Sequence, residues 1–522
     1  MQKQINIKVL PSEANDSDKL KQIIAQACSQ SEENINGYNI QKQSIDARGK
    51  TIWFQLSVNV FINEPYQSIE ILKPELQDVH NAAKRVIIVG AGPAGLFAAL
   101  RLIEHGIKPV ILERGKDVRA RRRDLAAINK LGEINPESNY CFGEGGAGTY
   151  SDGKLYTRST KRGDVKRILN ILVHFGATEK ILYEAHPHIG TNKLPHIITA
   201  IREQIIECGG EVLFNKKVTD LIIETDKIVG VKTTDDQTLK ADAVVLATGH
   251  SARDIFQLLR SRNIDIEFKP FALGVRVEHP QGLIDSIQYH CSNRGDFLPP
   301  ASYSLVQQVH DKGVFSFCMC PGGIIAPAAT SPGEIVVNGW SPSKRNNPYA
   351  NSGIVVTVDE RMTNNFSNQG ALAGMFFQQL VEQKAYAAGG GRLVAPAQRL
   401  IDFAEGKSSS SLPHCSYLPG IHSVDLGEVL PTTIHQCLQS AFKQFGKKMK
   451  GYYTNDAVVV ATESRTSSPV RIPRDESLQH PQIKRLYPCA EGAGYAGGIV
   501  SAAMDGERVA DMIAANNNDS SL

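Results

Sequence analysis

The sequence lacks any long hydrophobic run. No window approaches the roughly 18 uninterrupted apolar residues that suggest a membrane-spanning helix. Residues 1–4 lead into a predicted strand rather than into the apolar region of a signal peptide. We therefore expect a soluble protein of the cytoplasm, without a membrane segment.

A charge imbalance is also lacking. The 57 Lys and Arg residues nearly match the 54 Asp and Glu residues, and the net charge of +3 gives no global field for nucleic acid or a membrane surface. The one dense basic run, residues 119–123, lies in a predicted helix. It forms either a solvated helix face or a contact with phosphate groups.

The nine cysteines lack both the even number of a disulfide framework and the spacing of zinc ligands. This usage suits a reducing compartment, and we expect no metal site. The chain has 522 residues, of which 21% are charged and 42% are hydrophobic. It is too long for a single core and too apolar for wholesale disorder, so we expect two or three globular domains.

The clearest motif that is present is a glycine turn between a strand and a helix. Residues 86–89 predict a buried parallel strand, and residues 93–105 predict the helix that follows it. Gly90 permits the tight turn, Gly92 lets a phosphate approach the backbone, and Gly95 lets the helix press against the strand. The free N–H groups at the helix start favour a pyrophosphate.

A second predicted strand, residues 109–112, leads to Glu113, which lies 23 residues beyond Gly90. A carboxylate at this place can accept hydrogen bonds from the ribose hydroxyls of adenosine. Because strand, turn, helix, second strand and acid all coincide, the motif predicts a dinucleotide site.

Around this motif the pattern predicts an α/β protein with a discontinuous Rossmann-like domain. In the N-terminal part, residues 5–10, 38–47 and 51–61 predict strands and residues 17–29 predict a helix. The predicted units are a small N-terminal β-α-β-β domain (1–80), the first part of the nucleotide-binding domain (84–267), an inserted α+β substrate or cap domain (268–452), the return of the nucleotide-binding domain (453–515) and a disordered tail (516–522).

Two further glycine-rich segments belong to the nucleotide-binding domain. The loop of residues 141–154 implies backbone pressed against a large planar or anionic ligand, and a flexible surface loop is the alternative. Residues 492–497 repeat the three-glycine pattern, but only 25 residues follow them, too few for a second nucleotide domain. They therefore bring a second helix start to the distal end of the same cofactor, where it would stabilise charge on a reduced flavin.

The Gly90 turn, the Ala247-Thr248-Gly249 turn and the C-terminal glycine loop together resemble the two-dinucleotide-binding-domain flavoproteins of the glutathione-reductase superfamily. More narrowly, the chain resembles a bacterial family described as uncharacterised FAD-dependent dehydrogenases. The segments that carry this resemblance are 142–149, 151–155, 271–280, 317–323 and 466–471. It covers nearly the whole chain, including residues 44–48.

The resemblance implies non-covalently bound FAD. The glycine turn would contact the pyrophosphate, Glu113 the ribose, Val218 the adenine, and residues 497–499 the isoalloxazine. The residues implied for the cofactor site are Gly90, Gly92, Pro93, Ala94, Gly95, Glu113, Arg114, Gly145, Gly146, Lys154, Val218, Ala247, Gly249, Glu491, Gly497, Gly498 and Ile499. Lys154 would touch the N5 side of the flavin or close the turn at Asp152. Many relatives have an Asp after a Gly where this chain has Glu491-Gly492, so the ribityl or phosphate contact departs from the usual pattern.

Cys318 and Cys320 are the first candidates for chemistry, because a dithiol near a flavin can exchange an electron pair. In a regular strand both side chains point to one face, but positions i and i+2 lie about 6.6 Å apart, at the upper limit for a disulfide. A redox pair and simple packing of small apolar thiols are the alternatives, and a zinc site lacks further ligands nearby.

Two arginines complete the candidates. Arg276 shares a predicted strand face with Glu278 and serves either as a clamp for a substrate carboxylate or as a partner in an internal ion pair. Arg465 lies among hydroxyl side chains in residues 463–471. This cluster suits an anionic substrate, or a loop tied down by pairing between Arg and Glu.

These features predict an FAD-dependent oxidoreductase that moves a hydride or an electron pair between FAD and a small molecule, with an anion as one option. NADH or NADPH would visit the substrate cleft transiently, or an electron-donor protein would deliver the electrons. One alternative is a flavoprotein that acts on RNA or tRNA, which the near-neutral charge and the missing basic stripe disfavour. The other is a non-catalytic, flavin-bound scaffold or sensor.

Overall fold

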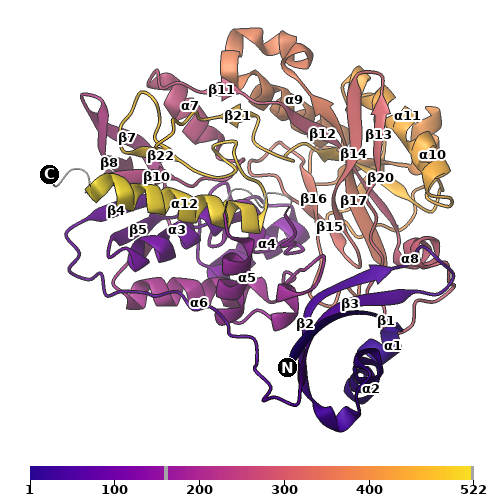
Figure 1. Ribbon diagram of the computed structural model, residues 1–522. Helices are drawn as coiled ribbons and strands as arrows, with labels where there is room; N and C mark the ends of the chain where they lie inside the picture. Colours follow the sequence, from indigo (N-terminus) through magenta and orange to yellow (C-terminus); the bar gives the residue numbers. More distant parts are fainter. Residues whose placement is uncertain (158–162, 519–522) are drawn as a thin grey trace.

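The computed structural model describes residues 1–157 and 163–518. It opens with a small unit in which an antiparallel sheet, in the order β1-β3-β2, curves around two helices (Figure 1). Its elements are β1 (Gln2–Val9), α1 (Pro11–Ala14), α2 (Ser17–Cys28), β2 (Ile35–Asp46) and β3 (Trp53–Ile62). Alternate residues of β3, Phe54, Leu56 and Val58, are buried with Leu20 and Ile24 of α2 in one core. The predicted strand, helix and two further strands are confirmed, with α1 as a short addition.

The nucleotide-binding domain is built on a parallel sheet in the order β22-β10-β4-β5-β6. Its strands are β4 (Arg85–Val89), β5 (Lys108–Leu112), β6 (Glu211–Leu213), β10 (Ala243–Leu246) and β22 (Leu486–Pro488). Residues 86–89 are buried on both faces of the sheet, as their continuous apolar run predicts. Because β22 comes from the far end of the chain and pairs with β10, the domain is discontinuous, as predicted.

Two layers cover this sheet. Val86 and Ile88 face one helical layer, and Ile87 and Val89 face the other layer, because neighbouring side chains of a strand point to opposite faces. The first layer contains α3 (Pro93–Glu104), α5 (Val165–His174), α6 (Leu194–Glu207) and α12 (Ile499–Asn518), and α3 and α12 lie side by side in it (Figure 1). The second contains the meander of β7 (Val218–Glu224), β8 (Lys227–Thr233) and β9 (Thr238–Lys240) with α7 (Arg253–Ser261). The helix α4 (Val118–Leu131) follows β5.

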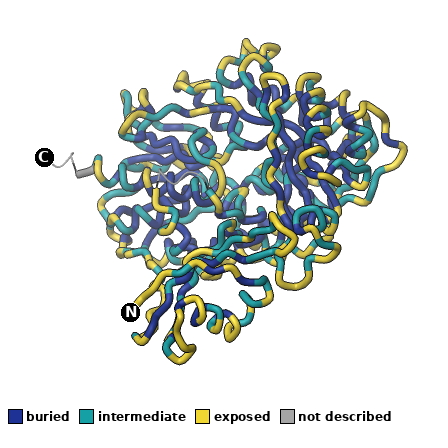
Figure 2. The backbone as a smooth tube through the Cα atoms, turned by 45° about the vertical axis from the view of Figure 1, so that its right-hand side comes forward, coloured by how far each residue is buried: buried dark blue, intermediate teal, exposed yellow. Residues whose placement is uncertain are grey.

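A third part of the chain, which we call the cap unit, is built around a seven-stranded sheet in the order β13-β14-β17-β12-β20-β18-β19. Neighbouring strands run antiparallel, except β18 and β19. Its elements are β12 (Phe271–Pro280), α8 (Gln281–Tyr289), β13 (Val306–Val309), β14 (Lys312–Cys320), β15 (Ile324–Pro327), β16 (Val337–Trp340), β17 (Tyr349–Val358), α9 (Ala373–Ala388), β18 (Ala395–Arg399), α10 (Leu400–Glu405), β19 (Ile421–Ser423), α11 (Thr432–Lys448) and β20 (Val458–Glu463). Figure 2 shows the buried backbone gathered inside the two large units, with exposed chain at their rims.

Two predicted boundaries differ from the structure. The strand β20 lies in the cap sheet, between β12 and β18, whereas the sequence assigned it to the returning nucleotide domain. Its apolar run of residues 458–461 is buried on both faces, and such a run fits a central strand of either sheet. At the C-terminus α12 continues to Asn518, into the segment predicted as a disordered tail, and residues 519–522 lie outside the described residues.

Within the described ranges, no helix is both long enough and apolar enough to cross a membrane.

Candidate functional site

One cavity lies at the carboxyl ends of β4 and β10, between the parallel sheet and the cap unit. Its walls come from the Gly90 turn, the loop 141–154, the residues after β10, the end of β14 and the start of α12. The predicted cofactor residues that line it are Gly90, Gly92, Pro93, Ala94, Glu113, Arg114, Gly146, Lys154, Val218, Ala247, Gly249, Glu491, Gly498 and Ile499. Three others, Gly95, Gly145 and Gly497, are not part of this lining.

The glycine turn has the geometry that its sequence predicts. Gly90 has a φ of +108°, a region that residues with a side chain rarely adopt. A Cβ on Gly95 would lie 2.0 Å from the carbonyl oxygen of Gly90, so only glycine lets α3 approach β4 this closely. A Cβ on Gly92 would meet no protein atom within 4 Å, although Gly92 lines the cavity. The turn therefore offers bare backbone to a ligand.

The carboxylate of Glu113 fastens three loops at the cavity. It accepts hydrogen bonds from the backbone N–H groups of Ala91, Gly115 and Gly143, each at 2.9 Å. The side chain is buried, yet it lines the cavity. Its predicted contact with ribose stays a prediction, and the structure adds a positioning role that the spacing alone did not indicate.

Contacts of Gly145 and Arg114 stabilise the wall of the cavity. Gly145 donates its N–H to the carbonyl oxygen of Ala91 at 2.8 Å, which ties the loop 141–154 to the glycine turn. The Arg114 guanidinium lies over the Phe142 ring, 4.1 Å from its centroid, and donates to Asp254 at 2.9 Å. The second glycine-rich loop is therefore packed against the turn, rather than being a loose surface loop.

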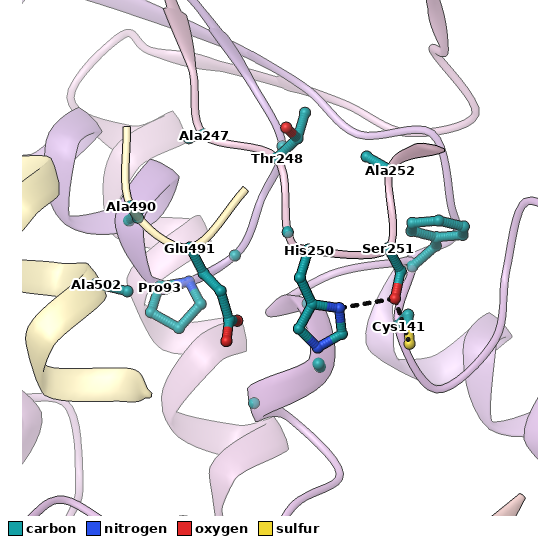
Figure 3. A pocket seen from close by; sticks show the side chains of 18 of the residues that line it. Pro93, Cys141, Ala247, Thr248, His250, Ser251, Ala252, Ala490, Glu491 and Ala502 are labelled. Carbon is teal, nitrogen blue, oxygen red and sulfur yellow. Dashed lines mark hydrogen bonds between the residues drawn. The ribbon is translucent and has the colours of Figure 1, made fainter. Parts of the chain in front are cut away.

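The C-terminal glycine loop delivers Glu491 and the start of α12 to the same cavity. In Figure 3 the Glu491 side chain points into the space between Pro93 and His250. Burial raises the pKa of the Glu491 carboxyl to about 7, and the positive charge of Lys269 offsets this only in part. Gly498, with a φ of +82°, makes the turn into α12.

Arg276 is fully buried and does not line the cavity. It donates from Nη1 to Glu463 Oε2 at 2.7 Å and from Nε to Asn351 at 2.8 Å. Of the two sequence alternatives, the structure contains the ion pair, although the partner is Glu463 of β20 and not Glu278. Glu278 instead accepts a hydrogen bond from the backbone N–H of Ser416 at 2.7 Å.

Arg465 lines the cavity but is paired within the protein. It donates to both oxygens of Glu382 and to Glu334, at 2.9 to 3.0 Å, and also to Thr330. Arg253 pairs with the same two carboxylates. The sequence alternative of a loop tied down by Arg–Glu pairing therefore describes this cluster, and its charges balance.

The basic run 119–123 is not a uniformly solvated face. Arg121 is fully buried and donates to the backbone carbonyl oxygens of Asn139, Tyr140 and Glu144, at 2.8 to 3.0 Å. It holds the start of the loop 141–154 in place. This arginine is therefore unavailable to phosphate groups of an outside ligand.

His250 is one of several lining residues that the sequence did not point to. Its Nδ1 lies 2.8 Å from Ser251 Oγ, which in turn donates to Cys141 Sγ at 3.4 Å (Figure 3). Burial and the nearby cations Arg465 and Arg253 lower the pKa of His250 to about 4. Its position in the sequence could have identified it, because His250 directly follows the Ala247-Thr248-Gly249 turn and a residue that follows a nucleotide-binding turn faces the same cavity.

Comparison with known proteins decides the family. Models for a domain of unknown function, for pyridine nucleotide-disulphide oxidoreductases and for the C-terminal domain of FAD-dependent proteins match residues 1–61, 84–258 and 270–466. An uncharacterised protein of Clostridium beijerinckii is 40% identical over 520 residues, which cover 96% of each chain. The chain belongs to this family of FAD-dependent proteins.

Two partial likenesses accompany this match. Thiamine thiazole synthase of Aeropyrum pernix is 30% identical over 182 residues, which cover 32% of this FAD-dependent chain and 55% of that enzyme. Glycine oxidase from Bacillus cereus shares 14% identity over 83% of this chain and 95% of its own, with a TM-score of 0.32. FAD is the cofactor of this family, and the chain is an FAD-dependent oxidoreductase.

The cavity fits this cofactor. Two helix starts, of α3 and α12, meet at it from distant parts of the sequence, and their free N–H groups favour phosphate at one end and a negatively charged flavin at the other. Gly92 lines the cavity, and no protein atom lies within 4 Å of the place that a Cβ on it would take, which leaves its backbone open to a pyrophosphate. The flavoprotein would hold FAD with Gly92 at the pyrophosphate and Gly498 at the flavin.

Proposed function

We propose that this flavoprotein transfers a hydride or an electron pair between FAD and a small molecule that binds in a recess next to His250. A second, smaller cavity adjoins the cofactor cavity and shares Cys141, His250 and Arg465 with it. This shared wall is the observation that carries the proposal. A molecule in the recess would lie beside the cofactor without displacing it from the protein groups that bind it.

The recess is small, with a volume of about 40 Å³, so it suits a small substrate or one end of a larger one. Its lining combines the aromatic side chains of Tyr140, Tyr150 and Trp340 with small apolar residues and a few polar groups, His250 and Asn338 among them. This mixture favours a substrate with a planar or apolar part and one or two polar groups. Since the charges around Arg465 balance, an anionic group gains little from that wall.

The chain supplies an acid–base group at the recess, and FAD when bound supplies the two-electron acceptor or donor. His250 is held neutral near pH 7 by its low pKa of about 4. Its Nδ1 is engaged by Ser251, which leaves Nε2 for a substrate. A neutral imidazole in this position accepts the proton that a substrate loses during oxidation, or returns it during reduction.

Anaerobic reduction of the purified FAD-bound protein tests the proposal. NADH, NADPH and a panel of small aromatic or apolar metabolites are added in turn while the flavin absorbance is followed. We expect at least one compound to bleach the flavin band, and His250→Gln to slow that reaction while dithionite still reduces the variant normally. If dithionite alone reduces the wild type, the proposal fails and a flavin-bound sensor or scaffold, or a dedicated electron-donor protein, takes its place.

A further inference from the structure

Cys318 and Cys320 lie at the end of β14, where the strand is irregular. The pairing of β14 with β17 shifts register between Phe317 and Cys320, and Cys318 has a φ of +45°. The two side chains therefore do not follow the regular-strand geometry expected from the sequence. Cys318 lines the cofactor cavity, whereas Cys320 is fully buried behind it. Both cysteines are free, and Cys320 Sγ donates to the carbonyl oxygen of Cys318 at 3.3 Å.

Two cations flank this thiol pair. Lys154 Nζ lies 3.8 Å from Cys318 Sγ and 4.0 Å from Cys320 Sγ, and it is anchored on the carbonyl oxygen of Met319. Arg276 Nη2 lies 3.6 Å from Cys320 Sγ and donates to the carbonyl oxygen of Cys318 at 2.6 Å. Such electropositive surroundings favour a thiolate.

Lys154 is the least closely paired cation beside the thiols. Asp152 lies 4.0 Å from Lys154 Nζ and is also paired with Arg345, whereas Arg276 is paired with Glu463. Two further carboxylates lie beside these arginines, Glu184 near Arg345 and Glu278 near Arg276. The neighbouring Cys320 thiol and the attraction of Lys154 hold the pKa of Cys318 well below its usual range, and the pKa of Cys320 lies well above it. A thiolate at Cys318 would give Lys154 a second negatively charged partner.

We propose that Cys318 and Cys320 are a redox-active dithiol, with Cys318 as the thiolate that faces the flavin end of the cavity and Cys320 as its protonated, buried partner. The proposal deepens the proposed function, on which it rests. Closing the S–S bond removes two electrons from the two sulfurs and one proton from Cys320, and oxidised FAD takes up both electrons and that proton. In the reverse direction the S–S bond breaks, Cys320 regains the proton and Cys318 returns to a thiolate beside Lys154.

Counting electrons tests the pair directly. The FAD-bound protein is first oxidised with ferricyanide, which forms no mixed disulfide with a single thiol, then freed of it and titrated anaerobically with dithionite. We expect the wild type to take up four electrons per flavin, two for FAD and two for the disulfide, whereas Cys318→Ser and Cys320→Ser take up two. The matched control Cys208→Ser, at a free cysteine at the end of α6, should keep four. Equal uptake by all four proteins overturns the proposal.

Peptide mass spectrometry gives a second readout that does not depend on the flavin. After oxidation the peptide that contains both residues should be lighter by two hydrogens and resist alkylation, and reduction should restore two alkylation sites. A pair that stays in the dithiol form with excess ferricyanide overturns the proposal. If metabolites bleach the flavin but the pair does not oxidise, only this inference fails. If the disulfide forms but no metabolite bleaches the flavin, the proposed function fails instead.

Discussion

Gly506 of α12 packs against the backbone of Ala94 of α3, so closely that a Cβ on Gly506 would lie 2.2 Å from the Ala94 carbonyl oxygen. Ala94 lines the cofactor cavity, as does Ile499 at the start of α12. This contact fixes the distance between the two helix starts. If the two helix starts bind the two ends of FAD, as we expect, this binding depends on a glycine that itself lies outside the cavity lining.

Gly506→Ala should weaken both the fold and the cofactor site. The added methyl group must push α12 away from α3, and such overpacking destabilises a protein by about 1–3 kcal/mol. We expect a lower melting temperature and less FAD retained after gel filtration. The matched control is Gly282→Ala in α8, where a Cβ would meet nothing within 4 Å. If the two variants behave alike, the helix contact does not hold the site.

Gly92→Ala should separate cofactor affinity from stability. The residue has a φ of −76°, which alanine adopts readily, and its Cβ would project into the cavity rather than into protein. We expect the FAD-free protein to melt at the wild-type temperature, while FAD affinity, measured by fluorescence titration, falls about tenfold or more because the methyl group excludes the pyrophosphate. Gly95→Ala should instead lower both the melting temperature and the FAD affinity, because its Cβ clashes with Gly90. If Gly92→Ala binds FAD as tightly as the wild type, the pyrophosphate does not bind at Gly92.

The sequence predicted those features that are determined by residues close together along the chain. The Gly90 turn, its strand and its helix follow from local spacing, and so does the return of the chain at Gly498. The partners of the buried arginines could not be predicted, because Arg276 meets Glu463 187 residues further along, and Arg465, in the loop after β20, meets Glu382 of α9. Likewise, the register shift in β14 that turns Cys318 to the cavity depends on pairing with β17.

Glu491→Gln should stabilise the FAD-free protein at high pH. The carboxyl has a pKa of about 7 in the folded protein and 4.5 without burial, so its stability contribution is fully present below pH 4.5 and is lost as the pH rises through 7. The neutral amide avoids this loss. We expect equal melting temperatures at pH 4.5 and an advantage for the variant on the order of 1–2 kcal/mol at pH 8. An advantage of the same size at both pH values would assign the effect to packing rather than to charge.

Lys154→Met should make Cys318 less reactive. The methionine keeps the bulk of the side chain but removes the positive charge that lies 3.8 Å from Cys318 Sγ. Without this charge the pKa of the Cys318 thiol should rise, so the midpoint of the pH dependence of its alkylation by iodoacetamide should move to a higher pH. Alkylation is followed by mass spectrometry on the peptide that contains Cys318, and Lys154→Arg, which keeps the charge, should keep a midpoint close to that of the wild type. Equal midpoints in wild type and Lys154→Met would show that Lys154 does not stabilise the thiolate.

His250→Gln should change stability with pH in the sense opposite to Glu491→Gln. The folded-state pKa of His250 is about 4, below the ordinary value of 6.5, because burial and two arginines oppose its protonation. The contribution of neutral His250 to the free energy of unfolding is therefore fully present above pH 6.5. It is lost as the pH falls towards 4, by up to about 3 kcal/mol. Glutamine does not titrate, so the variant should lose less stability over that range in urea unfolding followed at pH 7, 5.5 and 4.5. His422→Gln, at an exposed residue, serves as the control and should follow the wild type. If stability falls equally with pH in wild type and His250→Gln, His250 is protonated as readily in the folded protein as in the unfolded one. The acid–base role proposed for a neutral His250 would then no longer hold.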